Sequence, residues 1–211
     1  TNKIYFKLLQ EGESMPFMKP VSMNELPEDI LERFKHYQNT RGFTPNSIQT
    51  MVRRPNIVRA FMQLNQAVLY EGTVDEELKM LVSLIASQVA GCRYCQAHMA
   101  NLSKIYQASE EKISQVWNYE ESDLFTDAEK AALRLAYYGA MSPSQSSQEH
   151  FDELNKHYDE NEIVEIVATI SLFGFLNRWN DTLATEIEQL PAMVAKETIG
   201  KTFNWEAGKH E

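Results

Sequence analysis

The chain has 211 residues, of which 43% are hydrophobic and 24% charged, so it can bury a sizeable core and is not an intrinsically disordered chain. Twenty Lys and Arg residues against 30 Asp and Glu residues give a net charge of −10, which argues against binding to nucleic acid or to an anionic membrane surface. Only 8 glycines and 7 prolines interrupt the chain, which is too few for a fold of many short strands and favours helices.

The N-terminal residues 1–25 contain Gly12, Pro16 and Pro20 between short apolar runs, and we expect an irregular arm there. Residues 26–211 have helical periodicity almost throughout, which predicts a single all-α domain with a C-terminal tail over 191–211. We expect helices over about 27–39, 55–71, 76–90, 92–107, a short one from 109, and then over 126–138, a segment ending near 158, and 162–188.

Local signals set several of these boundaries. Thr126 followed by Glu129 is typical of a capping box, and Asp159 is a good cap for the last long helix. Gly174 would bend that helix, and Pro191 would stop it. Trp205 in the tail is expected to pack back onto the body of the protein or onto a neighbouring subunit.

The longest mostly apolar stretch, Met80 to Ala90, is broken by polar residues and is shorter than the roughly 20 residues that a bilayer requires. The first residues also lack the apolar core of a secretory signal. We therefore expect a cytoplasmic protein that does not enter a membrane.

Both cysteines of the chain lie in one Cys-x-x-Cys cluster, Cys92 and Cys95, directly after Gly91. If a helix begins at Gly91 or Cys92, both thiols lie in its first turn, where unpaired N–H groups favour an anion. Such a position can lower a thiol pKa from about 8.5 to about 3.5–7.5, and the thiolate is the reactive form. Two residues three apart share a helix face, so these two can form a disulfide after a small adjustment.

His98 lies three residues beyond Cys95 on the same face, where an imidazole can accept a thiol proton directly or through one water. The simpler alternatives are a pair of inert core thiols and a histidine bonded to a backbone carbonyl. A zinc site would use Cys92, Cys95 and His98, but it lacks the usual fourth ligand in sequence. We expect neither a metal nor a cofactor.

The stretch from Leu78 through Gly91-Cys92-Arg93-Tyr94-Cys95-Gln96-Ala97-His98 resembles the carboxymuconolactone decarboxylase / alkylhydroperoxidase D (AhpD-like) superfamily, in its peroxidase-related branch. The resemblance is specific around the two cysteines and weaker over the rest of 55–190 and the closing tail. It implies an AhpD-like helical fold and a homo-oligomer, commonly a trimer or a hexamer.

The resemblance also implies an enzyme, a thiol-dependent peroxidase that reduces a peroxide substrate. By this likeness Cys95 would attack the peroxide and become a sulfenic acid, and Cys92 would donate a proton and then condense with it to a disulfide. A separate thiol reductant or redox partner would restore the dithiol. A decarboxylase-like enzyme of the same fold and a non-catalytic redox-sensing oligomer are the alternatives.

Two positions depart from the pattern of the family. A relay glutamate usually stands twelve residues before the first cysteine, where this chain has Met80, and the relay histidine usually follows the second cysteine by four residues, where it has Met99. Glu76 and Glu77 lie one turn before Met80, and we consider them as possible replacements in the relay. Their alternative role is that of ordinary acids in the first turn of a helix.

For the other charged residues and histidines we expect structural roles. Arg178 and Asp181, at positions i and i+3, are expected to form an ion pair within the helix or between subunits. The histidines outside the cysteine cluster are expected at the surface: His36, His150, His157 and His210.

Overall fold

The computed structural model of the protein describes residues 16–21 and 26–211. Most of the predicted N-terminal arm, 1–25, therefore lies outside the described residues. In the described part of the chain the regular elements are all helices, which confirms the predicted all-α class. None of the helices described there is both long and apolar enough to cross a membrane.

Within residues 16–21 and 26–211 the α-helices follow one another with short connections, and the 3₁₀ turns are η2 (Val116–Asn118) and η3 (Gly208–His210). The α-helices are α2 (Glu28–Arg41), α3 (Asn46–Met51), α4 (Pro55–Leu69), α5 (Glu76–Ala90), α6 (Arg93–Ile105), α7 (Glu110–Ser114), α8 (Asp127–Gly139), α9 (Gln148–Leu154), α10 (Glu160–Leu183), α11 (Gln189–Glu197) and α12 (Ile199–Phe203).

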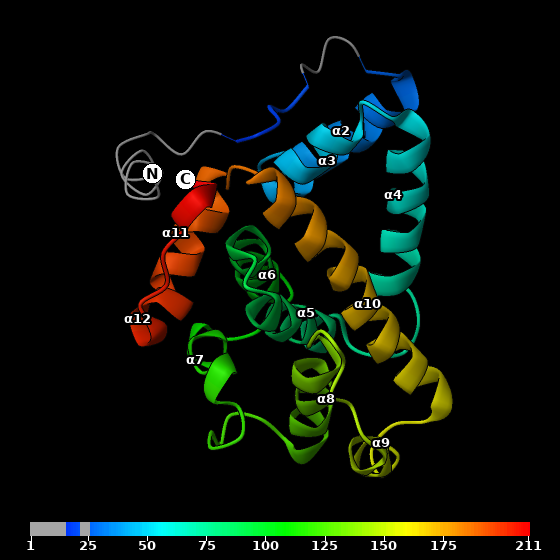
Figure 1. The fold of residues 1–211 in the computed structure, drawn as a ribbon, viewed down its shortest axis with the longest axis vertical. Coiled ribbons are helices and arrows are strands. Elements are labelled where there is room, and N and C mark those ends of the chain that lie inside the picture. Colours follow the sequence, from blue (N-terminus) through cyan, green and yellow to red (C-terminus); the bar gives the residue numbers. More distant parts are fainter. Residues whose placement is uncertain (1–15, 22–25) are drawn as a thin grey trace, which may run out of the picture.

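The hairpin of α5 and α6 forms the centre of the fold, as Figure 1 shows. Helix α10 packs along α5 and also contacts α6, while α8 covers α5 and α11 covers α6. Helix α5 is therefore buried on most sides, as its apolar sequence predicts, and Met80, Leu81 and Leu84 have no exposed surface. The two cysteines lie at the turn of this central hairpin.

Gly91 makes the sharp turn between α5 and α6 possible. Its φ of +75° is in the left-handed region, which a residue with a Cβ adopts only with strain. The N–H of Cys92 then donates to the carbonyl of Ser87 (3.2 Å), which closes the end of α5. The turn places Cys92 at the N-cap of α6.

The predicted boundaries of the last long helix are wrong at its C-terminal end. Helix α10 ends at Leu183, because Ala184 takes a left-handed conformation (φ 47°). Pro191 does not stop a helix but lies in the first turn of α11, where the missing N–H has no intrahelical partner to lose. Glu188 thereby becomes the N-cap residue of α11. The short α3, in a segment expected to be a loop, is also new.

The C-terminal tail folds back onto the core. Trp205 is buried, and its indole N–H donates to the side-chain oxygen of Gln96 (3.0 Å), so the expected packing of this residue is observed within the chain. His210 is buried too, with Nδ1 2.8 Å from the carbonyl of Thr185, and its predicted place at the surface is wrong. Asp181 pairs with Lys209 of the tail (2.9 Å) in place of the predicted Arg178.

Candidate active site

The Cys-x-x-Cys motif lies at the N-terminus of α6, as predicted. Cys92 is the N-cap residue, and its Sγ accepts the backbone N–H of Cys95 at 3.5 Å. Both thiols are free, and they are 0% and 2% exposed, respectively. The amide at the start of the helix therefore points at the sulfur of Cys92 and not at that of Cys95.

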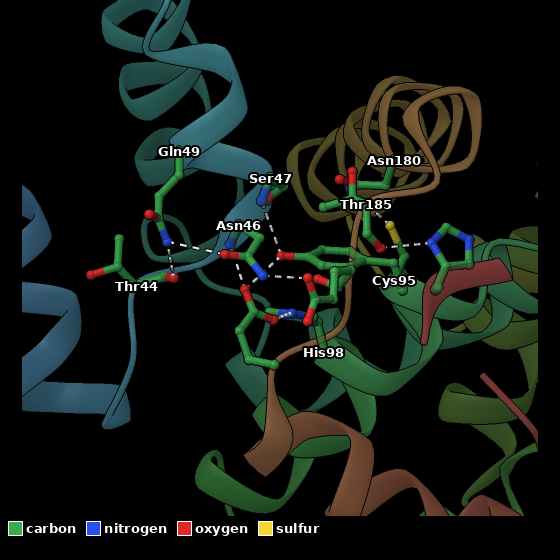
Figure 2. Close-up of polar contacts among 12 residues, drawn as sticks. Thr44, Asn46, Ser47, Gln49, Cys95, His98, Asn180 and Thr185 are labelled. Atoms are coloured by element: carbon green, nitrogen blue, oxygen red, sulfur yellow. Dashed lines mark hydrogen bonds and ion pairs between the residues drawn. The ribbon is translucent and has the colours of Figure 1, made fainter. Parts of the chain in front are cut away.

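Cys95 faces a small cavity of about 50 Å³, whereas Cys92 does not line it. The side-chain N–H of Asn180, on α10, donates to the sulfur of Cys95 (3.4 Å), and Figure 2 shows the two side chains together. The remaining wall is mostly apolar and aromatic and includes Tyr37, Ile48, Phe61, Leu69, Tyr70, Tyr94, Leu102, Phe173 and Leu176. The site thus presents one thiol to a small apolar space and keeps the second thiol behind it.

The pKa of the Cys95 thiol is raised well above its ordinary value. Burial is the main cause, and the neighbouring Cys92 adds to it, while the hydrogen bond from Asn180 opposes the rise. The expectation that the helix start lowers the thiol pKa is wrong for Cys95, because desolvation dominates and the helix N–H is used by Cys92. Cys95 is consequently a neutral thiol at neutral pH in the resting protein.

His98 lines the same cavity as Cys95. Its Nε2 lies 2.6 Å from a carboxylate oxygen of Glu188, its ring stacks on Tyr94 with centroids 4.2 Å apart, and Phe43 packs edge-on against it at 5.5 Å. Of the two roles considered for His98, the bond to a backbone carbonyl is not what the structure shows. The ring is held in a fixed orientation by a carboxylate on one side and by aromatic rings on its faces.

Glu188 was not recognised as a site residue from the sequence. It accepts hydrogen bonds from the backbone N–H of Asn46 and from the Tyr94 hydroxyl (3.1 Å), in addition to its contact with His98. Burial raises the pKa of Glu188, but His98 and the hydrogen bonds outweigh it, so the pKa is lowered overall. The available signal was Pro191, which indicates a helix start a few residues earlier and hence a capping acid at this position.

Tyr94 connects three elements at the site. Its hydroxyl accepts the backbone N–H of Ser47 (3.1 Å) and donates to Glu188, so α6 is tied to α3 and to the start of α11 (Figure 2). Burial and the nearby Glu188 carboxylate raise the pKa of the Tyr94 phenol well above its usual value. Tyr94 thus orders the carboxylate that holds His98.

The structure favours the alternative role considered for Glu76 and Glu77, that of ordinary acids in the first turn of a helix, over the relay role. These residues begin α5, whereas the cysteines follow its end, and a helix of this length separates its two ends by about 20 Å. Glu77 instead pairs with Lys112 (2.7 Å), which also contacts Glu129. Met80 and Met99 are buried in the core. Over the described residues no cluster of three or more Cys, His, Asp or Glu side chains could hold a metal ion.

The comparisons with known proteins begin with the sequence. Residues 55–137 match the Carboxymuconolactone decarboxylase family. The chain is 28% identical over 112 residues to the uncharacterized protein YdfG of Bacillus subtilis strain 168, which covers 52% of this chain and 74% of that protein. It is 26% identical over 110 residues to the uncharacterized protein YnjA of Escherichia coli K12, covering 52% of this chain and 60% of that protein.

Solved structures extend the likeness over most of the chain. The apo debrominase Bmp8 is 33% identical with a TM-score of 0.79, covering 85% of this chain and 96% of Bmp8. A cysteine-to-alanine variant of Bmp8 in complex with 2,3,4-tribromopyrrole matches equally well, with a TM-score of 0.79 at 32% identity, covering 85% of this chain and 95% of that one. A peroxidase-related protein of Ralstonia eutropha JMP134, described as an AhpD core, has a TM-score of 0.77 at 23% identity, covering 85% and 96% of the two chains.

The fold and the position of the cysteine pair define an all-α protein of the AhpD-like class. The chain belongs to the carboxymuconolactone decarboxylase/AhpD superfamily. The resemblance found in the sequence is thereby confirmed. Members of this superfamily are enzymes, among them the debrominase Bmp8.

Proposed function

We propose that the protein is a dithiol peroxidase, which reduces an organic hydroperoxide and converts Cys92 and Cys95 into a disulfide. The observation that carries the proposal is the different placement of the two sulfurs. Cys95 lines a small cavity, and Cys92 lies beside it at the N-cap of α6 and does not line the cavity. A nucleophile that meets substrate and a second thiol that waits behind it are the two parts that such a cycle requires.

The proposed reaction balances in two steps. The sulfur of Cys95 attacks the terminal peroxide oxygen, the O–O bond breaks, the organic fragment leaves as an alcohol, and Cys95 becomes a sulfenic acid. The sulfur of Cys92 then attacks the sulfenic sulfur, the S–O bond breaks, and water leaves as the disulfide forms. The two thiol protons end on the alcohol and on the water, and an external thiol reductant returns the protein to the dithiol.

Cys95 must lose its proton before it attacks, since burial holds it as a neutral thiol. His98 lines the same cavity, and the Glu188 carboxylate holds its ring in place to accept this proton. A cavity of about 50 Å³ has room for a water or two between the groups. The Asn180 N–H then stabilises the thiolate as it forms.

The protein is further proposed to act in the cytoplasm as a homo-oligomer. Helix α10 supports the assembly, because Val164, Val167 and Phe175 expose 67%, 39% and 43% of their surface on this apolar helix. Covering these side chains in a trimer or hexamer would bury apolar surface that water otherwise contacts.

Reductive dehalogenation is a second candidate, favoured by the likeness to the debrominase Bmp8 over 96% of its chain. The same two thiols supply two electrons in this reaction. A carbon–bromine bond breaks, carbon gains hydrogen, bromide and a proton leave, and the disulfide forms.

The deciding experiment is a single turnover with the reduced protein. The thiols are reduced, the reductant is removed, and one equivalent of cumene hydroperoxide or of a polybrominated pyrrole is added. Trypsin cleaves after Arg93, so a Cys92–Cys95 disulfide joins two peptides that are otherwise separate in mass spectrometry. We expect this linkage together with one equivalent of cumyl alcohol, and none in Cys95→Ser.

The outcomes separate the candidates. Bromide release with no reaction of the hydroperoxide would favour the dehalogenase. Two free thiols after both treatments would refute dithiol chemistry altogether. Turnover of a lactone or β-keto acid that survives in a Cys92→Ser, Cys95→Ser double variant would favour the decarboxylase alternative.

A further inference from the structure

A second, larger cavity lies next to the cavity that Cys95 faces. Its volume is about 240 Å³, and it lies between the C-terminal half of α2 and the ends of α4 and α6. The two cavities share three lining residues, namely Tyr37, Arg41 and Tyr70. We call the second cavity the outer cavity. Its other lining residues are Arg33, His36, Thr40, Gln66, Ile105 and Tyr106.

The outer cavity is positively charged, although the chain carries a net charge of −10. Arg33 and Arg41 line it, and no carboxylate does. Over the described residues neither arginine forms an ion pair with an Asp or Glu side chain. The two charges are therefore available to an anion that enters from solvent.

Neutral groups hold Arg41 at the boundary between the two cavities. Its guanidinium lies 4.7 Å from the centre of the Tyr37 ring and donates to the Tyr70 hydroxyl at 2.6 Å. Burial raises the pKa of Tyr70 to about 12, although Arg41 opposes the rise, so this phenol remains uncharged at neutral pH. Tyr70 therefore orients Arg41 without cancelling its charge.

Arg33 also lies near the ring of Tyr37. Its guanidinium is 5.8 Å from the centre of Tyr37, and its Nη2 donates to the side-chain oxygen of Gln66 (3.1 Å). Uncharged partners thus hold both guanidinium groups near one aromatic ring on the wall of the outer cavity. The planar fork of a guanidinium group matches the two oxygens of a carboxylate.

We propose that the outer cavity binds the carboxylate of an organic substrate and that the rest of this substrate passes Arg41 and Tyr70 to reach Cys95. The inference builds on the proposed dithiol function and specifies its substrate class: an acid-bearing organic molecule, with the anion at Arg41 and Arg33 and the reactive group in the small cavity. Arg41 and Arg33 are binding residues in this proposal and take no part in the thiol chemistry.

The test compares iodoacetate with iodoacetamide as reagents for Cys95. The two reagents have nearly the same size and leaving group and differ in charge, and each needs only the thiolate, so the ratio of their rates reports the electrostatics of the access route. Trypsin cleavage after Arg93 allows labelling at Cys95 to be measured separately from labelling at Cys92. The measurement needs no turnover, so it can succeed even where the proposed peroxidase activity fails.

We compare the rate of Cys95 alkylation by iodoacetate with the rate by iodoacetamide. The ratio of these two rates should be at least about threefold higher in the folded protein than in the protein unfolded in urea. The ratio should fall at least about twofold, toward the value in urea, in Arg41→Gln and less in Arg33→Gln, while Arg41→Lys retains most of it. Arg54→Gln is the matched control, because Arg54 is exposed and lines neither cavity.

A ratio in the folded wild type no higher than in urea would overturn the proposal, as would equal losses in Arg41→Gln and Arg54→Gln. Arg33→Gln guards against misfolding of the Arg41 variant, because Arg33 lies outside the boundary with the small cavity. A normal far-UV spectrum with an unchanged ratio in both variants would likewise refute the role of the outer cavity.

Discussion

Glu188→Gln removes a buried negative charge from the centre of the candidate site and keeps the shape of the side chain. In the wild-type protein this carboxylate contacts His98, Tyr94 and the backbone N–H of Asn46. Glu188 is also the N-cap residue of α11 by position, although its side chain makes no capping hydrogen bond. A glutamine can still accept one or two of these hydrogen bonds. It cannot supply the charge that attracts the imidazole.

The expected loss of stability of Glu188→Gln at neutral pH follows from the burial and the hydrogen bonds of the carboxylate. The carboxylate accepts three hydrogen bonds, each worth about 1.5–3 kcal/mol because the acceptor is charged, and the amide retains about half of this contribution. We therefore expect Glu188→Gln to lower the free energy of unfolding by about 3 kcal/mol. With a urea dependence of about 2–3 kcal/mol per molar, the unfolding midpoint should fall by about 1–1.5 M.

The pH dependence gives an independent check. The pKa of Glu188 is lower in the folded protein than its ordinary value of 4.5, so its contribution to stability is present above pH 4.5 and is lost as the pH falls through the folded pKa. The urea midpoints of wild type and Glu188→Gln should therefore converge below that range. The variant lacks the titrating carboxylate and should lose less stability on acidification.

Glu186→Gln is the matched control, because Glu186 is exposed and only two residues away. Both variants lose one negative charge, so general effects of charge cancel in the comparison. Measurements at fixed protein concentration avoid shifts from subunit association. A decrease in the free energy of unfolding below about 1 kcal/mol for Glu188→Gln would refute the central role of this carboxylate. Plots of the urea midpoint against pH that stay parallel for the two proteins down to pH 3 would refute it as well.

Three further predictions concern reactivity. The rate of Cys95 alkylation by iodoacetamide should rise about tenfold per pH unit between pH 7 and 9, because only the thiolate reacts and burial raises the thiol pKa; a plateau below pH 8 would contradict this. Asn180→Ala removes the N–H that stabilises the thiolate and should slow alkylation of Cys95 about three- to tenfold at pH 8. An alkylation rate equal to that of the wild type would argue against this role of Asn180. Glu77→Gln should leave the hydroperoxide rate within about twofold of wild type while weakening the contact with Lys112, and a tenfold loss would restore Glu77 to the relay.

The α5–α6 hairpin could be predicted from the sequence because its signals are local. The apolar stripe of α5, the left-handed turn at Gly91 and the cysteine at the start of α6 all depend on residues within one or two helical turns. The family resemblance rests on the same segment, and the comparisons confirm it. Local patterns were sufficient to place both sulfurs at a helix N-terminus.

The partners of His98 could not be predicted in the same way. Glu188 is 90 residues away in sequence, and it reaches the site only because α10 ends at Ala184 and the chain starts a new helix. Asn46, which fixes the carboxylate from the other side, lies in a segment expected to be a loop. Contacts between such distant segments depend on the packing of whole helices, which periodicity does not determine.

The direction of the pKa shift of Cys95 shows why the prediction from the Cys-x-x-Cys motif alone was wrong. A helix N-terminus favours an anion by about 0.3–1 kcal/mol, and by at most about 2 kcal/mol when partly buried. Full burial can shift a pKa by about 3–5 units, which corresponds to about 4–7 kcal/mol against the charged form. Desolvation therefore dominates at Cys95, all the more because the nearest helix N–H is directed at Cys92. A reactive Cys95 consequently needs a base at the moment of substrate entry, and His98, oriented by Glu188 on the wall of the same cavity, is placed to act as one.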